Sequence, residues 1–157
     1  MDRKFIDEYE HGGLKLRQAI QGLQREDLLA FPVAGTWSIQ QIVLHLADTE
    51  GVLTDRMKRI IAEERPTLLS FDETRWTSHL HYHDQSAEDA AALLELMRRQ
   101  MARVLRALPD DAFDRQGIHN EAGPQRLGEI VRKAASHLDH HLKFIVDKRE
   151  MLGKAMW

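Results

Sequence analysis

Four stretches of the chain repeat their apolar residues every three or four positions, which is the spacing of one face of an α-helix. They cover about residues 3–23, 38–64, 86–108 and 127–151. Each stretch has one apolar stripe and therefore has to bury that side against the other stretches. The pattern predicts an all-α protein, a four-helix bundle, in which residues 1–157 form a single domain.

Capping residues and prolines mark the ends of these predicted helices. Ser38 followed three residues later by Gln41 forms a capping box, and Ser86 begins the third stretch in a similar way. Pro66 and Pro109 follow the second and third stretches, and the residue before a proline disfavours helical geometry. The helix boundaries are therefore predicted by turn chemistry as well as by apolar spacing.

The remaining segments show no sustained period. Residues 66–85 are predicted to form a loop with at most a short helix, and residues 110–125 to form a second connection. Gly12 and Gly13 weaken the middle of the first helix, because glycine is a poor helix former. The fourth helix has Arg126 before it, where a Ser, Thr or Asp cap would be expected.

Composition excludes several classes of protein. The 22 Lys and Arg against 25 Asp and Glu give a net charge of -3, which disfavours a nucleic-acid partner. Apolar runs are far shorter than the roughly 20 residues that span a bilayer, and the N-terminus has no signal-like segment. Cysteine is absent, which excludes disulfides and thiolate zinc sites. We expect a cytoplasmic protein that binds neither nucleic acid nor membrane.

Three of the nine histidines fall on predicted buried faces. His137 and His141 are four residues apart, so both imidazoles point the same way and share the apolar stripe of the fourth helix. His45 lies on the flank of the stripe of the second helix. A single histidine on an apolar face is more often a core residue than a ligand, and two histidines at this spacing are a weak signal by themselves.

A metal ion would satisfy all three imidazoles at once. Each buried neutral imidazole leaves a ring nitrogen in need of a partner, and a divalent ion can bind three while keeping coordination positions open. Imidazole ligands suit zinc, nickel, copper or iron(II) and do not choose among them. The sequence therefore predicts His45, His137 and His141 as the ligands of one divalent metal.

The chain resembles the DinB/YfiT-like family of metal-dependent proteins over most of its length. The resemblance is carried by the motifs GTWSIQQIVLHLADTE (residues 35–50), Asp55-Arg56, Phe71-Asp72, Tyr82-His83 and HLDHHL (residues 137–142). It implies a four-helix bundle of the DinB/YfiT-like type with a divalent metal on His45, His137 and His141. Relatives often carry Asn where this chain has His140.

The same resemblance implies a reaction class. Family members include transferases that use low-molecular-weight thiols, a thiol-dependent isomerase, and proteins described as metal-dependent hydrolases. We therefore expect an enzyme whose metal activates a thiol or water toward a small electrophilic substrate. Zinc or nickel is the expected metal, with iron, manganese or copper as alternatives. The other interpretation is a stress-linked, dimeric, metal-binding bundle without turnover.

Five further residues are candidates for a pocket beside the metal. Thr49 and Arg56 lie on the same flank of the second helix as His45. Arg56 suits an anionic group, but an ordinary salt bridge with a glutamate of a neighbouring helix is the favoured interpretation. Trp76 and Tyr82 are expected either as pocket wall or as anchors of the loop, and His83, or alternatively His81, as a general base near the metal.

The alternation of His79, His81 and His83 allows a second metal site or a lid, but a solvated loop is the favoured interpretation. Asp48 and Glu50 turn away from His45 and are expected to be surface charges. Leu44, on the expected outer side of the second helix, supports a homodimer.

Overall fold

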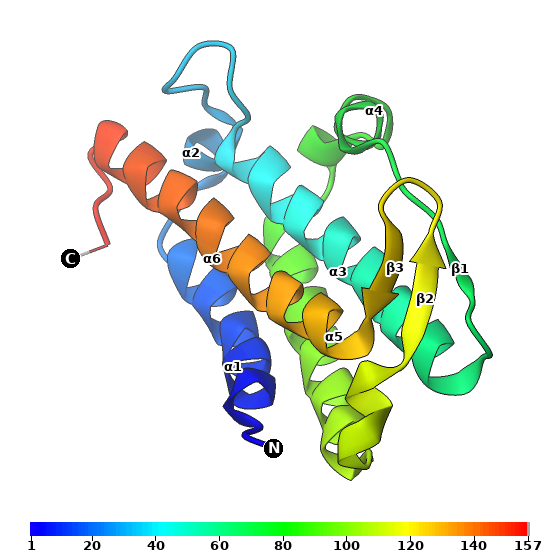
Figure 1. Ribbon diagram of the computed structural model, residues 1–157. Helices are drawn as coiled ribbons and strands as arrows, with labels where there is room; N and C mark the ends of the chain where they lie inside the picture. Colours follow the sequence, from blue (N-terminus) through cyan, green and yellow to red (C-terminus); the bar gives the residue numbers. More distant parts are fainter. Residues whose placement is uncertain (157) are drawn as a thin grey trace.

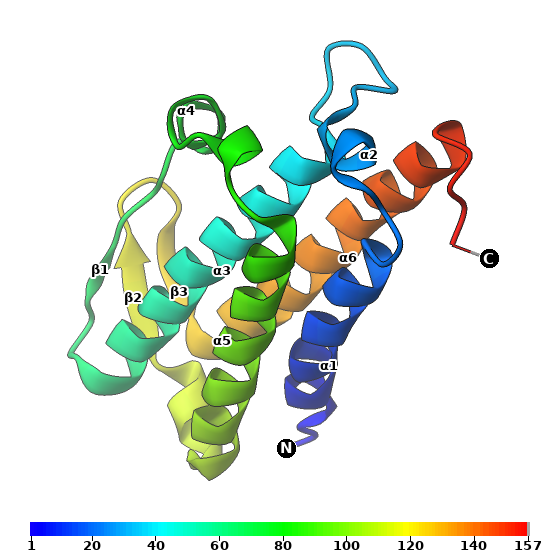
Figure 2. The same cartoon turned by 180° about the vertical axis from the view of Figure 1, so that it is seen from behind.

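The computed structural model describes residues 1–156 and confirms the all-α four-helix bundle (Figure 1). The four long helices are α1 (Lys4–Ala19), α3 (Ile39–Ala62), α5 (Ala87–Ala107) and α6 (Leu127–Met151). Helices α1 and α3 each pack against both α5 and α6, as Figures 1 and 2 show from opposite sides. No helix of the described chain is long and apolar enough to cross a bilayer.

Short elements fill the segments that the sequence analysis treated as connections. They are α2 (Arg25–Leu29), β1 (Thr67–Leu68), α4 (Glu73–His79), η1 (Tyr82–Asp84), η2 (Asp110–Asp114), β2 (Gln116–His119) and β3 (Gly123–Arg126). The strands form a sheet in the order β1-β2-β3, with β1 parallel to β2 and β2 antiparallel to β3. The sheet corrects the expectation of two plain connections, and its strands are too short to show a period.

The capping predictions are confirmed at α3. The Ser38 hydroxyl accepts a hydrogen bond from the Gln41 amide at 3.1 Å, and the Gln41 side chain accepts one from the Ser38 amide at 3.0 Å. At the start of α6, the Arg126 amide donates to the Glu129 carboxylate at 3.0 Å. This carboxylate supplies part of a cap that the sequence analysis missed, which explains how α6 begins without a capping hydroxyl.

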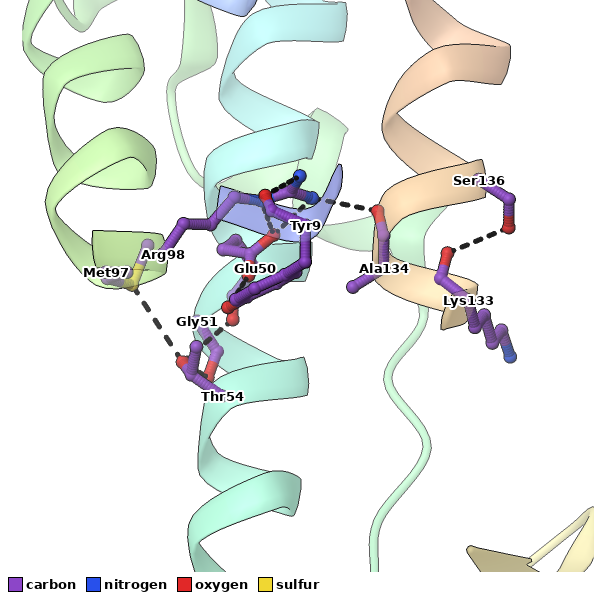
Figure 3. A network of polar contacts seen from close by, with 9 residues as sticks. All are labelled: Tyr9, Glu50, Gly51, Thr54, Met97, Arg98, Lys133, Ala134 and Ser136. Carbon is purple, nitrogen blue, oxygen red and sulfur yellow. Dashed lines mark hydrogen bonds and ion pairs between the residues drawn. The ribbon is translucent and has the colours of Figure 1, made fainter. Parts of the chain in front are cut away.

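The core consists of two apolar clusters with a polar layer between them. One cluster contains Leu16, Leu46, Leu94 and Leu138, and the other contains Leu53, Met101, Leu105 and Val131. Glu50 on α3 and Arg98 on α5 lie between these positions, and Figure 3 shows them in contact with Tyr9 and Ala134 at the edge of the second cluster. The polar layer therefore crosses the bundle at the level where its apolar stripes are interrupted.

Arg98 satisfies its buried guanidinium within this layer. It forms an ion pair with Glu50 at 2.8 Å, and it donates to the backbone oxygens of Tyr9 at 2.9 Å and Ala134 at 2.8 Å. The Tyr9 hydroxyl donates to the other Glu50 oxygen at 2.6 Å. The expectation that Glu50 is a surface charge is wrong, because the residue is only 2% exposed. The ion pair thus joins α3 to α5, and the hydrogen bonds of Arg98 to Tyr9 and Ala134 add α1 and α6.

The two glycines of α1 have a packing role. A Cβ atom at Gly12 would lie 2.3 Å from Arg98 Nη1, and one at Gly13 would lie 2.9 Å from the Glu95 backbone. The helix continues through both positions despite their low propensity. These glycines therefore allow α1 to approach α5 closely enough for Arg98 to reach the Tyr9 carbonyl.

Leu44 is 3% exposed and belongs to the first apolar cluster. The expectation that it lies on the outer side of its helix is wrong, because the N-terminal part of α3 is covered by neighbours on several sides. The N-terminal region of α3 also contacts η1 and α2. Leu44 consequently provides no support for a subunit contact.

Candidate metal centre

The three predicted histidines come together between α3 and α6. His45 lies on α3, and His137 and His141 lie one turn apart on α6. One nitrogen of each imidazole falls within 4.8 Å of the others, and among residues 1–156 these are the side chains that form such a group. Packing of α3 against α6 thus brings the three imidazole rings together, as their positions on or beside the apolar stripes predicted.

The arrangement fits a divalent metal ion. His45 Nε2 and His137 Nε2 are 3.3 Å apart. Two nitrogens bound tetrahedrally to one ion at its usual bond length are also separated by about 3.3 Å. The Nδ1 atom of His141 is buried and has no hydrogen-bond partner among the described residues. The donor set and the unpaired nitrogen are therefore consistent with an ion held by these three side chains.

The electrostatics keep the imidazoles in the neutral form that binds metals. Burial lowers the pKa of His45 to about 3, and repulsion from His141 and His137 adds to this shift. Burial likewise lowers the pKa of His137 to about 4, with His141 and Lys133 as further causes. The pKa of His141 is also lowered, again mainly by burial. The rings therefore carry free lone pairs at neutral pH.

Thr49 lies beside the first ring. Its hydroxyl oxygen is 3.5 Å from His45 Nδ1, one turn further along α3. If Nδ1 carries the proton and donates to Thr49, the Nε2 lone pair faces His137 and is free for a metal. Thr49 can therefore orient His45, as residues behind metal ligands commonly do.

Trp37 covers the histidines from the start of α3. Its ring centroid is 4.9 Å from that of His45, and it stacks on His141 at 6.4 Å with an interplanar angle of 12°. A cavity of about 360 Å³ opens here, between Trp37, His141 and Phe144, with Lys148 in its wall. Trp37 appears in the sequence analysis only within the motif of residues 35–50, so this aromatic wall was missed.

Glu73 is a second residue that the sequence analysis missed. Its carboxylate lies 3.7 Å from His45 Nε2 and remains 58% exposed. The residue begins α4, in a segment whose sequence has no helical period. Only its position after Asp72, the N-cap of α4, was visible as a local signal. An acid is therefore present beside the imidazole nitrogens.

The other predicted pocket residues lie elsewhere. Arg56 and Trp76 line a separate cavity between α3, α5 and the segment containing α4. The Tyr82 hydroxyl donates to Asp48 at 2.5 Å, and His83 Nε2 is 2.9 Å from the Ser38 hydroxyl. Tyr82 and His83 thus attach η1 to the N-terminal half of α3. Asp48 is not a free surface charge, because it accepts this hydrogen bond.

The alternating histidines of the loop do not converge. His79 is exposed and close to the Ser78 hydroxyl and the Arg75 carbonyl, whereas His81 is exposed with a left-handed φ of 52°. His83 packs against Phe31. These three rings form no metal-type cluster within residues 1–156.

Two helices of this four-helix bundle direct three neutral imidazoles toward one point. The arrangement is typical of helical-bundle proteins that bind a divalent metal through histidines. Comparison with known proteins gives the family. The model of the DinB superfamily matches residues 9–145, and the chain belongs to that superfamily.

Individual relatives cover nearly the whole chain. A protein of Oceanobacillus iheyensis named "putative metal-dependent hydrolase" is 29% identical over 142 residues, which are 90% of this chain and 82% of that protein. YfiT of Bacillus subtilis, which carries the same description, is 26% identical over 96% of this chain and 85% of its own length.

The solved structure of YfiT is similar in fold. It superposes with a TM-score of 0.90 at 25% sequence identity, covering 98% of this chain and 90% of that chain. YfiT is described as having an unusual four-helix bundle topology. The bundle of this chain, together with the short helices and strands that connect its long helices, is therefore of the YfiT type.

Proposed function

We propose that this protein is a metal-dependent enzyme in which His45, His137 and His141 hold a divalent metal, with zinc or nickel as the first candidates. The observation that carries the proposal is the convergence of three neutral imidazoles beside an open cavity. The naming of relatives as metal-dependent hydrolases supports the general class. When bound, the metal would lower the pKa of a water or thiol and make it nucleophilic near neutral pH.

Other residues of the chain contact the substrate, orient His45 and accept a proton in the proposed reaction. Trp37 and Phe144 offer apolar surface to a small electrophilic substrate next to His141. Thr49 keeps His45 in one orientation. Glu73 Oε2 accepts the proton that the water or thiol loses, since this carboxylate lies next to the imidazoles and is open to solvent.

We include low-molecular-weight thiols among the substrates, with the thiol acting as the nucleophile. The metal-side cavity of about 360 Å³ is of a size for small molecules, near the lower end of ordinary ligand pockets. Its wall is largely apolar, which suits an electrophile with an aromatic or alkyl part. We also propose a homodimer, but Leu44, the residue expected to support it, is buried.

The test is an activity screen with matched histidine variants. The metal-loaded wild type is assayed for transfer of several small thiols to chlorodinitrobenzene and for hydrolysis of nitrophenyl acetate. His141→Ala removes a ring of the cluster, whereas His140→Ala removes an exposed ring from the adjacent position of the same helix. We expect turnover in the wild type and in His140→Ala, and a loss of about 100-fold or more in His141→Ala.

Background rates for all three proteins, with several metals, would contradict the enzyme proposal. Full metal occupancy together with background rates would favour the alternative, a metal-binding bundle without turnover. Equal activity in His141→Ala and wild type would show that any turnover arises elsewhere in the chain.

A further inference from the structure

A second, larger cavity lies on the other side of α3 from the polar layer. Its volume is about 700 Å³, and it is bounded by α3, by α5 and by the segment that contains β1 and α4. Most of its wall is apolar, formed by Val52, Leu69, Phe71, Trp76, Leu93 and Met97. Leu69 and Leu93 remain well exposed to solvent. The cavity thus presents apolar side chains that the bundle itself does not cover.

Arg56 is the unusual residue in this wall. It is only 6% exposed, and its Nη2 atom donates to the Leu69 carbonyl at 2.6 Å. Its Nε atom is buried and has no hydrogen-bond partner, and within residues 1–156 no carboxylate forms an ion pair with this guanidinium. Burial also lowers the pKa of Arg56. The charge of the nearby Asp55 carboxylate opposes part of this pKa shift, but Asp55 forms its ion pair with Arg59. A buried cation outside any ion pair is costly unless an anion completes the site.

The other charged residues of the α3 wall already have polar partners. Asp55 and Arg59 form an ion pair at 2.8 Å, and Asp48 accepts a hydrogen bond from Tyr82. His119, on β2, is the further titratable group near Arg56; burial lowers its pKa, and the charge of Arg56 adds to this shift. Arg56 is therefore the cation of this wall that lies outside any ion pair, and the two carboxylates of the wall would repel a dianion.

We infer that this cavity binds a small monocarboxylate with an apolar tail, with the carboxylate on Arg56 and the tail against Trp76, Phe71 and Leu93. A guanidinium forms strong charge-assisted hydrogen bonds to a carboxylate. The volume lies in the usual range of ligand pockets. The inference does not rest on the metal centre, because the cavity shares no lining residue with the cavity beside His141.

Calorimetric titration with octanoate tests the site. The wild type is expected to bind octanoate saturably and to bind neutral octanol and inorganic phosphate at least tenfold more weakly. Arg56→Gln removes the charge and is expected to weaken octanoate binding about tenfold or more. Lys58→Gln is the matched control, and it should retain wild-type affinity because Lys58 is an exposed cation of the same helix that does not line the cavity.

A filling variant leaves Arg56 untouched. Gly51 lines the cavity, and a Cβ atom there would meet nothing within 4 Å, so Gly51→Leu should fold and fill the space. It is expected to weaken octanoate binding as strongly as Arg56→Gln, with unchanged helical circular dichroism. His141→Ala should bind octanoate like the wild type, which separates this site from a carboxylate bound to the metal.

The inference is overturned by any of several results. These are octanol or phosphate binding as tightly as octanoate, unchanged affinity in Gly51→Leu or in folded Arg56→Gln, loss of binding in His141→Ala, and absence of saturable octanoate binding by the wild type.

Discussion

Glu73 brings a carboxylate to within 3.7 Å of His45 from a short helix outside the bundle. Its role as a proton acceptor needs the negative charge of a carboxylate. Glutamine has nearly the same shape but lacks this charge. In the thiol-transfer or hydrolysis assay that registers turnover, Glu73→Gln should lower kcat/KM by about 100-fold while metal content stays unchanged. Glu64→Gln, at a 94% exposed side chain, is the control. Unchanged kcat/KM in Glu73→Gln would exclude this role.

The lowered histidine pKa values predict how metal binding depends on pH. With pKa values of about 3 and about 4, His45 and His137 stay neutral well below the ordinary 6.5, and they gain protons only as the pH falls toward 4. Metal binding at pH 6 should therefore release fewer than about one proton per ion from the chain, whereas three ordinary imidazoles would release more than about two. Calorimetry in buffers of different ionisation enthalpy measures this number, and release of two or more would contradict the shifts.

The contact between α1 and α5 depends on side-chain volume at single positions. Alanine normally stabilises a helix interior relative to glycine by about 0.5–1 kcal/mol. At Gly12 the added Cβ would lie 2.3 Å from Arg98 Nη1, so Gly12→Ala should lower the free energy of unfolding. At Gly51 the added Cβ meets open space, so Gly51→Ala should raise it. Urea unfolding measures both, and a stabilised Gly12→Ala would show that the approach of α1 is not tight.

The ion pair of the polar layer should matter more than any surface pair. Arg98→Met leaves Glu50 buried without its partner and should lower the free energy of unfolding by about 3–5 kcal/mol. Arg99→Met removes an exposed guanidinium from the next position of α5 and should have little effect. Equal urea midpoints for the two variants would contradict the role given to this layer.

At the level of the whole molecule, the sequence predicts those parts that repeat. The four long helices follow from apolar spacing, and the histidine cluster follows from the stripe of α6 together with the flank of α3. Short strands and the five-residue α2 have no period to detect. The positions of Glu73 and of the Glu50–Arg98 pair depend on tertiary packing. Helical spacing could place Glu50 on a side of its helix but could not show that Arg98 of α5 lies opposite it.

The bundle has a core of its own and should survive loss of the metal. Two apolar clusters and the polar layer connect all four long helices without any ion. Treatment with a chelator should therefore leave helical circular dichroism largely intact and lower the melting temperature, because a ligand of the native state stabilises it. Complete loss of helicity on chelation would show that the core alone is insufficient.

Elemental analysis of the purified protein and of matched histidine variants tests the metal site itself. A metal site on His45, His137 and His141 predicts about one divalent transition metal per chain in the wild type and in His140→Ala, and almost none in the His45→Ala, His137→Ala double variant. Full metal occupancy in that double variant, or no bound metal in a wild type supplied with zinc and nickel, would contradict it.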